Sequence, residues 1–143
     1  MTHATSTTAQ EFADRYVGLW NEPSPETRRT LIRELWSEQG EHVLQPPIQM
    51  REMARGLGFA EPRLELRGYA ALEARVQLAY DDFVAGGQHV FRARENAERL
   101  RDHIKFSWEM VSTRDGSVGG VGLNILVLDD QDRIRLDYTF IEP

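Results

Sequence analysis

The stretch from Glu11 to Pro47 constrains the fold more than any other part of the chain, because two short helices and a strand follow one another there with hardly a linker. The first helix is predicted by apolar residues that share one helical face, namely Phe12, Tyr16, Leu19 and Trp20. The segment from Asn21 to Pro25 ends that helix. Ser24 is a natural N-cap for the second helix, with Pro25 at its first position.

The second helix takes its buried face from four large apolar residues, Leu31, Ile32, Leu35 and Trp36. Gly40 is suited to the left-handed position that ends a helix. His42 to Gln45 then reads as a strand, which Pro46 and Pro47 terminate.

Residues 48–61 are ambiguous, although their apolar residues Met50, Met53 and Leu57 fit one face of a short helix. A short strand-like run, Arg63 to Leu66, follows Pro62. After Gly68 a third, longer helix is predicted by the spacing of Leu72, Val76, Tyr80 and Phe83, and it stops at Gly86 and Gly87.

Beyond residue 87 the hydrophobic period changes to two, which is typical of strands. Residues 88–95 alternate weakly, whereas 99–111 alternate clearly, with one apolar face made of Leu100, Ile104, Phe106, Trp108 and Met110. Asp115 and Gly116 predict a hairpin turn before a doubly buried strand, Val118 to Leu128. After a turn at 129–132, a last strand is expected to present an inner face of Ile134, Leu136, Tyr138 and Phe140. Three helices followed by antiparallel strands predict an α+β fold.

At 143 residues the chain is expected to form one domain over 9–143, with residues 1–8 as a disordered tail. The 17 basic and 23 acidic side chains give a net charge of −6, which disfavours nucleic acid as a partner. The chain has no cysteine, which excludes disulfides and thiolate chemistry. The sequence contains neither a membrane-spanning run nor a signal-peptide core, so we expect a cytoplasmic protein that does not bind membranes.

The order of elements resembles the nuclear-transport-factor-two-like cone fold, and within it the SnoaL-like group, which includes polyketide cyclases and lies beside ketosteroid isomerase. The resemblance covers roughly residues 9–142. It rests on four short segments: Tyr16-Val17-Gly18-Leu19-Trp20-Asn21, Leu35-Trp36, Val43 to Pro46, and Arg67-Gly68-Tyr69-Ala70-Ala71-Leu72. The resemblance implies that three helices in the N-terminal half pack on a curved, mainly antiparallel sheet around a deep apolar pocket. It also implies a homodimer.

Ketosteroid isomerase, a relative within this fold, uses an Asp base together with an oxyanion hole made of a Tyr and a second acid. By position these three groups fall on Gln45, Tyr16 and near Asn124. Gln45 takes up no proton at neutral pH, so isomerisation by that mechanism is disfavoured, while a polar cradle remains. Asn124 is the only hydrogen-bonding side chain between Val118 and Leu128, and it is equally consistent with a ligand-facing donor and with a satisfied core amide.

An alternative base must be a histidine or a carboxylate, and the resemblance to SnoaL-type cyclases implies a His and Asp pair. His42 has the opposite strand parity to Gln45 and is expected to point outward, whereas His89 is expected inward. Asp102 shares the parity of the inner face and is a candidate pocket carboxylate, while His103 is expected to be exposed. For Asp137 a salt bridge with neighbouring arginines is favoured over catalysis.

The four histidines show no metal-binding spacing, so no metal and no cofactor is expected. The glycines at 119, 120 and 122 lie within a strand, where they favour a strand bend or close helix packing over a phosphate loop. The catalytic candidates are Tyr16, Asn124, Asp102 and His89. The substrate-binding candidates are Trp20, Trp36, Gln45, Phe106, Trp108 and Tyr138.

Two functions follow from these residues and the resemblance. The first is a cofactor-free acid–base enzyme, such as a cyclase, isomerase, dehydratase or hydrolase, that acts on a small hydrophobic or polycyclic substrate. The second is a non-catalytic ligand-binding or protein-interaction domain on the same scaffold, because a fold does not determine a function.

Overall fold

The computed structural model describes residues 7–59 and 63–142, and all structural statements refer to these ranges. The helices are α1 (Ala9–Asn21), α2 (Pro25–Leu35), α3 (Ile48–Gly56) and α4 (Tyr69–Ala79), which runs on into the π-helical turn η1 (Tyr80–Val84). The strands are β1 (Trp36–Gln45), β2 (Leu64–Arg67), β3 (His89–Ala93), β4 (Glu98–Leu100), β5 (His103–Ser112), β6 (Val118–Leu128) and β7 (Ile134–Ile141).

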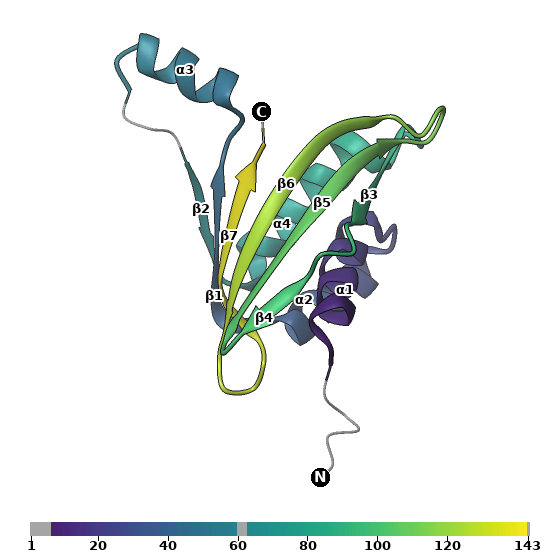
Figure 1. The fold of residues 1–143 in the computed structure, drawn as a ribbon, viewed down its shortest axis with the longest axis vertical. Helices are drawn as coiled ribbons and strands as arrows, with labels where there is room; N and C mark the ends of the chain where they lie inside the picture. Colours follow the sequence, from purple (N-terminus) through teal and green to yellow (C-terminus); the bar gives the residue numbers. More distant parts are fainter. Residues whose placement is uncertain (1–6, 60–62, 143) are drawn as a thin grey trace.

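The strands form one sheet in the order β2-β1-β7-β6-β5-β3, with β4 also paired to β5. All neighbours are antiparallel except β1 and β7, which run parallel. Helices α1, α2 and α4 lie together on one side of this curved sheet (Figure 1). The predicted α+β architecture is therefore confirmed, and we call the helix-covered side of the sheet its inner face.

The helix pair begins and ends where local chemistry dictates. Thr8 and Glu11 form a reciprocal capping box at the start of α1, and the Ser24 side chain accepts a hydrogen bond from the backbone N–H of Thr27, as predicted for an N-cap. The second helix ends at Leu35, so Trp36 opens β1 instead of closing the helix.

Gly40 does not end the second helix, contrary to the prediction, but lies within β1. A Cβ atom there would lie 2.7 Å from the Trp36 side chain and 2.8 Å from the Ile134 carbonyl oxygen. The glycine is thus required by close packing between β1 and β7, where the register of the two strands also shifts.

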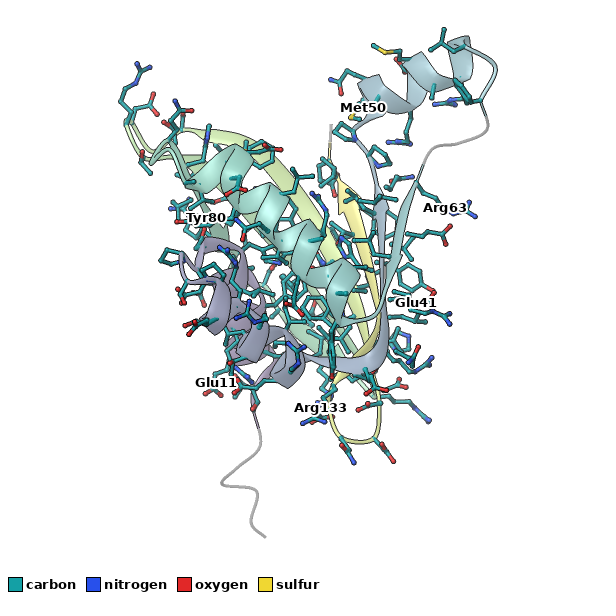
Figure 2. The ribbon with its side chains drawn as sticks, turned by 180° about the vertical axis from the view of Figure 1, so that it is seen from behind. Glu11, Glu41, Met50, Arg63, Tyr80 and Arg133 are labelled. Carbon is teal, nitrogen blue, oxygen red and sulfur yellow. The ribbon has the colours of Figure 1, made fainter. Side chains whose placement is uncertain are left out.

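Helix α3 stands on an arm formed by β1 and β2 and projects from the body of the molecule (Figures 1 and 2). None of its residues is buried, and Met50 and Met53 are 58% and 68% exposed. This confirms that the ambiguous segment is helical over 48–56, while the parts of the predictions that concern residues 1–6 and 60–62 lie outside the described ranges.

Two predictions about the strands are wrong. The alternating run 99–111 is divided into β4 and β5 by a turn in which Arg101 adopts a φ of 53°, so side-chain parity does not carry from Asp102 into β5. In β7 the inner face is formed by Asp137 and Thr139, which are 0% and 5% exposed, whereas Tyr138 points to the outer face. Of the apolar residues predicted to face inward, Ile134 is fully buried in the core, whereas Tyr138 and Phe140 are each 37% exposed.

The main core lies between the inner face of the sheet and the helices. Its fully buried members come from both layers and include Leu19, Ile32, Leu35, Trp36, Ile104, Phe106, Leu126 and Ile134. Within this apolar surround the sheet carries a small group of polar side chains, which form the candidate site.

Candidate functional site

The Asp137 carboxylate is the centre of a buried hydrogen-bond network. Its Oδ2 atom accepts a hydrogen bond from the Tyr16 hydroxyl at 2.5 Å and lies 2.9 Å from Nδ1 of His42. Its Oδ1 atom accepts from Nδ2 of Asn124 at 2.7 Å and from the Thr139 hydroxyl at 3.2 Å. Four donors thus surround one fully buried carboxylate, and we call these five residues the Asp137 network.

Strand register brings the members of the network together. His42 is the Cα partner of Asp137 across the parallel β1–β7 pair, and Asn124 is the partner of Thr139 across the antiparallel β6–β7 pair. Paired residues on neighbouring strands point to the same face, so all four side chains lie inward. Tyr16 reaches these side chains from the apolar face of α1, and the centroid of its ring lies 5.5 Å from the centroid of the Trp36 ring.

The network keeps its proton on Tyr16. Burial raises the pKa of Tyr16 well above its usual value, and the negative charge of Asp137 raises it further. The phenol therefore remains neutral and donates to the carboxylate. An ionised carboxylate only accepts hydrogen bonds, and four donors compensate for much of the cost of burying it.

Asp137 lies at Nδ1 of His42 as a hydrogen-bond acceptor, so the neutral tautomer that suits this contact has its proton on Nδ1 and a lone pair at Nε2. His42 is 2% exposed, and its Nε2 atom is buried with no hydrogen-bond partner among the described residues. The Trp20 ring lies beside it, with 6.0 Å between ring centroids. A histidine oriented by a carboxylate, with its second nitrogen free, has the arrangement of a general base.

Trp108 determines which way the Asn124 amide points. Its indole Nε1 donates to Oδ1 of Asn124 at 2.7 Å, so the amide nitrogen must face Tyr16, Asp137 and Thr139. The indole lies where a side chain of Gly122 would be, since a Cβ atom there would be 2.6 Å from Nε1. Gly122 thus makes room for an aromatic side chain of the neighbouring strand β5, whereas the sequence predicted a strand bend or close packing of a helix.

The structure brings two predicted catalytic residues together, Tyr16 and Asn124, whose side chains are 3.0 Å apart. His89 lies on the inward side at the start of β3, with its Nδ1 buried and unpaired among the described residues, but it forms no hydrogen bond with a member of the network. The expectation that Asp102 faces the pocket is wrong. Its side chain is 51% exposed in the β4–β5 turn, where it pairs with His103.

Among the predicted substrate-binding residues, Trp20, Trp36, Phe106 and Trp108 lie around the network on the inner side. Gln45 and Tyr138 do not, because Gln45 pairs with Phe140 on the outer face of the sheet. The alternation of side chains along β1 correctly predicted that His42 and Gln45 point to opposite faces of the sheet. His42, however, is the residue that points inward.

Sequence reasoning missed His42, Asp137 and Thr139 as site residues. The signal was present in β7, where Asp137 and Thr139 alternate with large apolar residues. Two polar residues two apart in such a strand share a face, and that face is the inner one when a helix supplies a partner.

A hollow of about 470 Å³ lies away from the network and is lined by Thr7, Phe12, Arg15, Glu34, Arg99, Gln131, Asp132 and Arg133. Its arginines Arg15 and Arg99 already pair with Glu34 and Asp132. Within residues 7–59 and 63–142, no three His, Asp or Glu side chains converge in a way that could hold a metal ion. In the same ranges no helix has the length and apolar character that crossing a membrane requires.

Several solved structures share this fold. A candidate isomerase of the SnoaL-like family from Agrobacterium tumefaciens superposes with a TM-score of 0.72 at 20% identity, over 94% of this chain and 97% of that one. The chain has the fold of the SnoaL-like and NTF2-like proteins. An NTF2-like protein of unknown function from Exiguobacterium gives 0.61 at 18% identity over 91% and 97%. A candidate polyketide cyclase from Sinorhizobium meliloti gives 0.56 at 10% identity over 93% and 99%.

No family model matches the sequence, and no curated protein matches it either. The fold shared with these solved structures confirms the resemblance to SnoaL-like and NTF2-like proteins that was inferred from the sequence. Chemistry has to be argued from the Asp137 network itself.

Proposed function

We propose that this protein is a cofactor-free acid–base enzyme that acts on a small hydrophobic or polycyclic molecule bound against the inner face of the sheet. The observation that carries the proposal is the 2.9 Å contact between Asp137 and Nδ1 of His42, which leaves a buried Nε2 atom unpaired among the described residues. In the proposed reaction Nε2 removes a proton from the substrate and returns it at another position. Asp137 holds the ring in place and stabilises the imidazolium that forms.

The surrounding side chains suit such a reaction. Tyr16 and Asn124 hold the Asp137 carboxylate in place through hydrogen bonds. Neither competes with His42 for the substrate proton, because the raised pKa of Tyr16 keeps its hydroxyl protonated and an amide is not a base. The aromatic rings of Trp20 and Phe106 exclude water, which strengthens each polar interaction. Two structural neighbours are described as a candidate isomerase and a candidate polyketide cyclase, which are acid–base reaction types.

The test uses enolisable probes, since proton removal next to a carbonyl needs no knowledge of the natural substrate. The full chain is incubated in deuterated buffer with 2-tetralone and a bicyclic β-keto ester, and deuterium uptake is followed by mass spectrometry. We expect the protein to accelerate exchange, and His42→Gln to lose on the order of 100-fold of that acceleration. The matched control is His103→Gln, because His103 also pairs with an aspartate, Asp102 at 2.8 Å, but on the surface.

Equal exchange by the wild type and His42→Gln would contradict the proposal. If the probes bind but exchange no faster than in buffer, the second candidate holds, a ligand-binding domain without turnover. One observation favours that candidate: all four hydrogen bonds to Asp137 come from within the protein, as in a purely structural network.

We also propose that the protein forms a homodimer through the outer face of the sheet. Along β6 and β7 this face presents three apolar cross-strand pairs, Val127 with Leu136, Ile125 with Tyr138 and Leu123 with Phe140. Tyr138 and Phe140 are each 37% exposed, so part of this apolar surface is in contact with water.

A further inference from the structure

Arg75 is an unusual cation for this protein. It lies on α4 beside the buried residues Leu72 and Val76, and no carboxylate among the described residues forms an ion pair with it. Its Nε atom is buried without a hydrogen-bond partner in the same ranges. By contrast, the more deeply buried Arg28 donates to the Glu22 carbonyl and to the Gln77 side chain.

The guanidinium lies close to the Asp137 network. Its Cζ atom is 5.7 Å from the centroid of the Trp20 ring, which on its own part is 6.0 Å from the ring of His42. The Nε1 atom of Trp20 is a further buried donor with no partner in the described ranges. Trp20 therefore lies next to both Arg75 and His42. Among the described residues, Arg75 forms no ion pair with a carboxylate, and Nε2 of His42 receives no hydrogen bond.

The folded protein offsets only part of the cost of burying the positive charge of Arg75. Burial lowers the pKa of Arg75, against the opposing influence of Tyr16 and of Asp82. The terminal nitrogens of Arg75 make no hydrogen bond with the described residues and are not among the buried unpaired atoms, so they are open to a ligand. A half-buried guanidinium, with two donors free and an indole N–H nearby, is complementary to an anion with two oxygens.

We infer that the ligand of this site carries a carboxylate, which Arg75 binds through its guanidinium fork while the apolar body of the ligand lies against Trp20 toward Nε2 of His42. This inference rests on the proposed function for the position of the ligand and adds the chemical class of the substrate. The Trp20 ring lies next to both Arg75 and His42, so a ligand that packs on this ring has its carboxylate end at Arg75 and its apolar body toward His42.

The test compares matched acids and amides, namely 2-naphthylacetate with 2-naphthylacetamide and 1-naphthoate with 1-naphthamide. Binding to the full chain is measured by calorimetry and by the shift of the Trp20 indole N–H signal. We expect each acid to bind at least tenfold more tightly than its amide. Arg75→Gln should abolish that preference by weakening the acid alone, while Arg29→Gln should retain it, because Arg29 is exposed and outside the site.

Three results would overturn the inference: amides that bind as tightly as their acids, acids that bind Arg75→Gln as tightly as the wild type, or no binding of any acid at millimolar concentration. A fourth, equal weakening by Arg29→Gln, would assign the preference to general charge and would also overturn it. The readout is binding, so the preference of the wild type for acids tests this inference even if deuterium exchange shows that His42 performs no catalysis.

Discussion

At the scale of single residues, the proton on Tyr16 links the network to alkaline stability. The pKa of Tyr16 is raised in the folded protein by burial and by Asp137, whereas in the unfolded chain it returns to about 10. Above pH 10 the unfolded state therefore loses a proton that the folded state keeps, and the free energy of unfolding falls as pH rises. We predict that Tyr16→Phe removes this contribution to the fall.

Urea unfolding of both proteins from pH 7 to about pH 11 measures the effect. At pH 7 Tyr16→Phe should be less stable by about 1–3 kcal/mol, because Asp137 loses a donor, and the difference should narrow above pH 10. The absorbance of tyrosinate gives an independent check, since the folded wild type and the variant should show the same increase. A larger increase in the wild type would mean that Tyr16 ionises in the folded protein.

The same residues mark how far a sequence can locate such a site. Tyr16 lies on a helical stripe and Asn124 is the single amide of an apolar strand, and both patterns could be recognised. His42 and Asp137 could not be assigned in the same way, because the choice of inward face in β1 and β7 depends on which helix partner each strand meets. For β7, Tyr16 supplies that partner to Asp137 from 121 residues away, and His42 of β1 bonds the same carboxylate.

At the scale of elements, Asn21 fastens the end of α1 to the edge of the sheet. Its Nδ2 atom donates to the Phe91 carbonyl at 2.7 Å, and its Oδ1 atom accepts from the Phe91 N–H at 2.8 Å. The side chain thus completes the backbone hydrogen bonds of the edge strand β3 as a neighbouring strand would. We predict that Asn21→Ala costs about 1–3 kcal/mol and makes the Phe91 amide exchange faster.

Hydrogen exchange followed by NMR at the Phe91 amide measures this role directly. Asn96→Ala is the control, because Asn96 accepts from the Ser107 backbone N–H and donates to the Ser107 hydroxyl on an exposed part of β5. It should leave the exchange of Phe91 unchanged. Unaltered protection of Phe91 in Asn21→Ala would show that packing alone holds β3.

Strand β6 contains a second element-scale dependence, at Gly122. We predict that Gly122→Ala displaces the Trp108 indole, breaks its bond to Asn124 and destabilises the protein by about 1–3 kcal/mol. Gly120→Ala on the same strand is the control, since its Cβ would meet the Met110 side chain at an ordinary 3.8 Å. Thermal unfolding and Trp108 fluorescence report the two effects, and equal stability of both variants would contradict the prediction.

The elements themselves were largely predictable. Helices α1 and α2 follow from apolar spacing, and α2 also from its cap at Ser24, whereas the cap of α1 is Thr8, a residue predicted to belong to the tail. The errors fall where the backbone leaves regular geometry: the positive φ of Arg101 divides one predicted strand, and the shift near Gly40 alters the pairing of β1. Both depend on contacts with other strands, which local periodicity does not contain.

At the scale of the whole molecule, the helices leave the outer face of the sheet uncovered while they enclose the inner one (Figure 1). Among the described residues, apolar side chains exposed to water include those of the β6–β7 face around Tyr138 and Phe140 and those of the projecting helix α3, such as Met53. The sheet face is built from paired residues on regular strands, so it is a rigid surface that a second copy can match by two-fold symmetry.

We therefore predict that the full chain sediments as a dimer, and that the double substitution Tyr138→Glu with Phe140→Glu yields a folded monomer. The physical reason is that the inserted carboxylates lose their hydration in the interface, whereas in the monomer they remain in water. Met53→Glu is the control, because it adds one negative charge to a side chain that is 68% exposed on α3, whereas the double substitution adds two to the sheet face. A monomeric wild type would exclude the sheet interface, and dissociation by Met53→Glu alone would move the contact to α3. Because the substituted residues point away from Asp137, the monomer should keep the deuterium exchange proposed for His42, which separates assembly from chemistry.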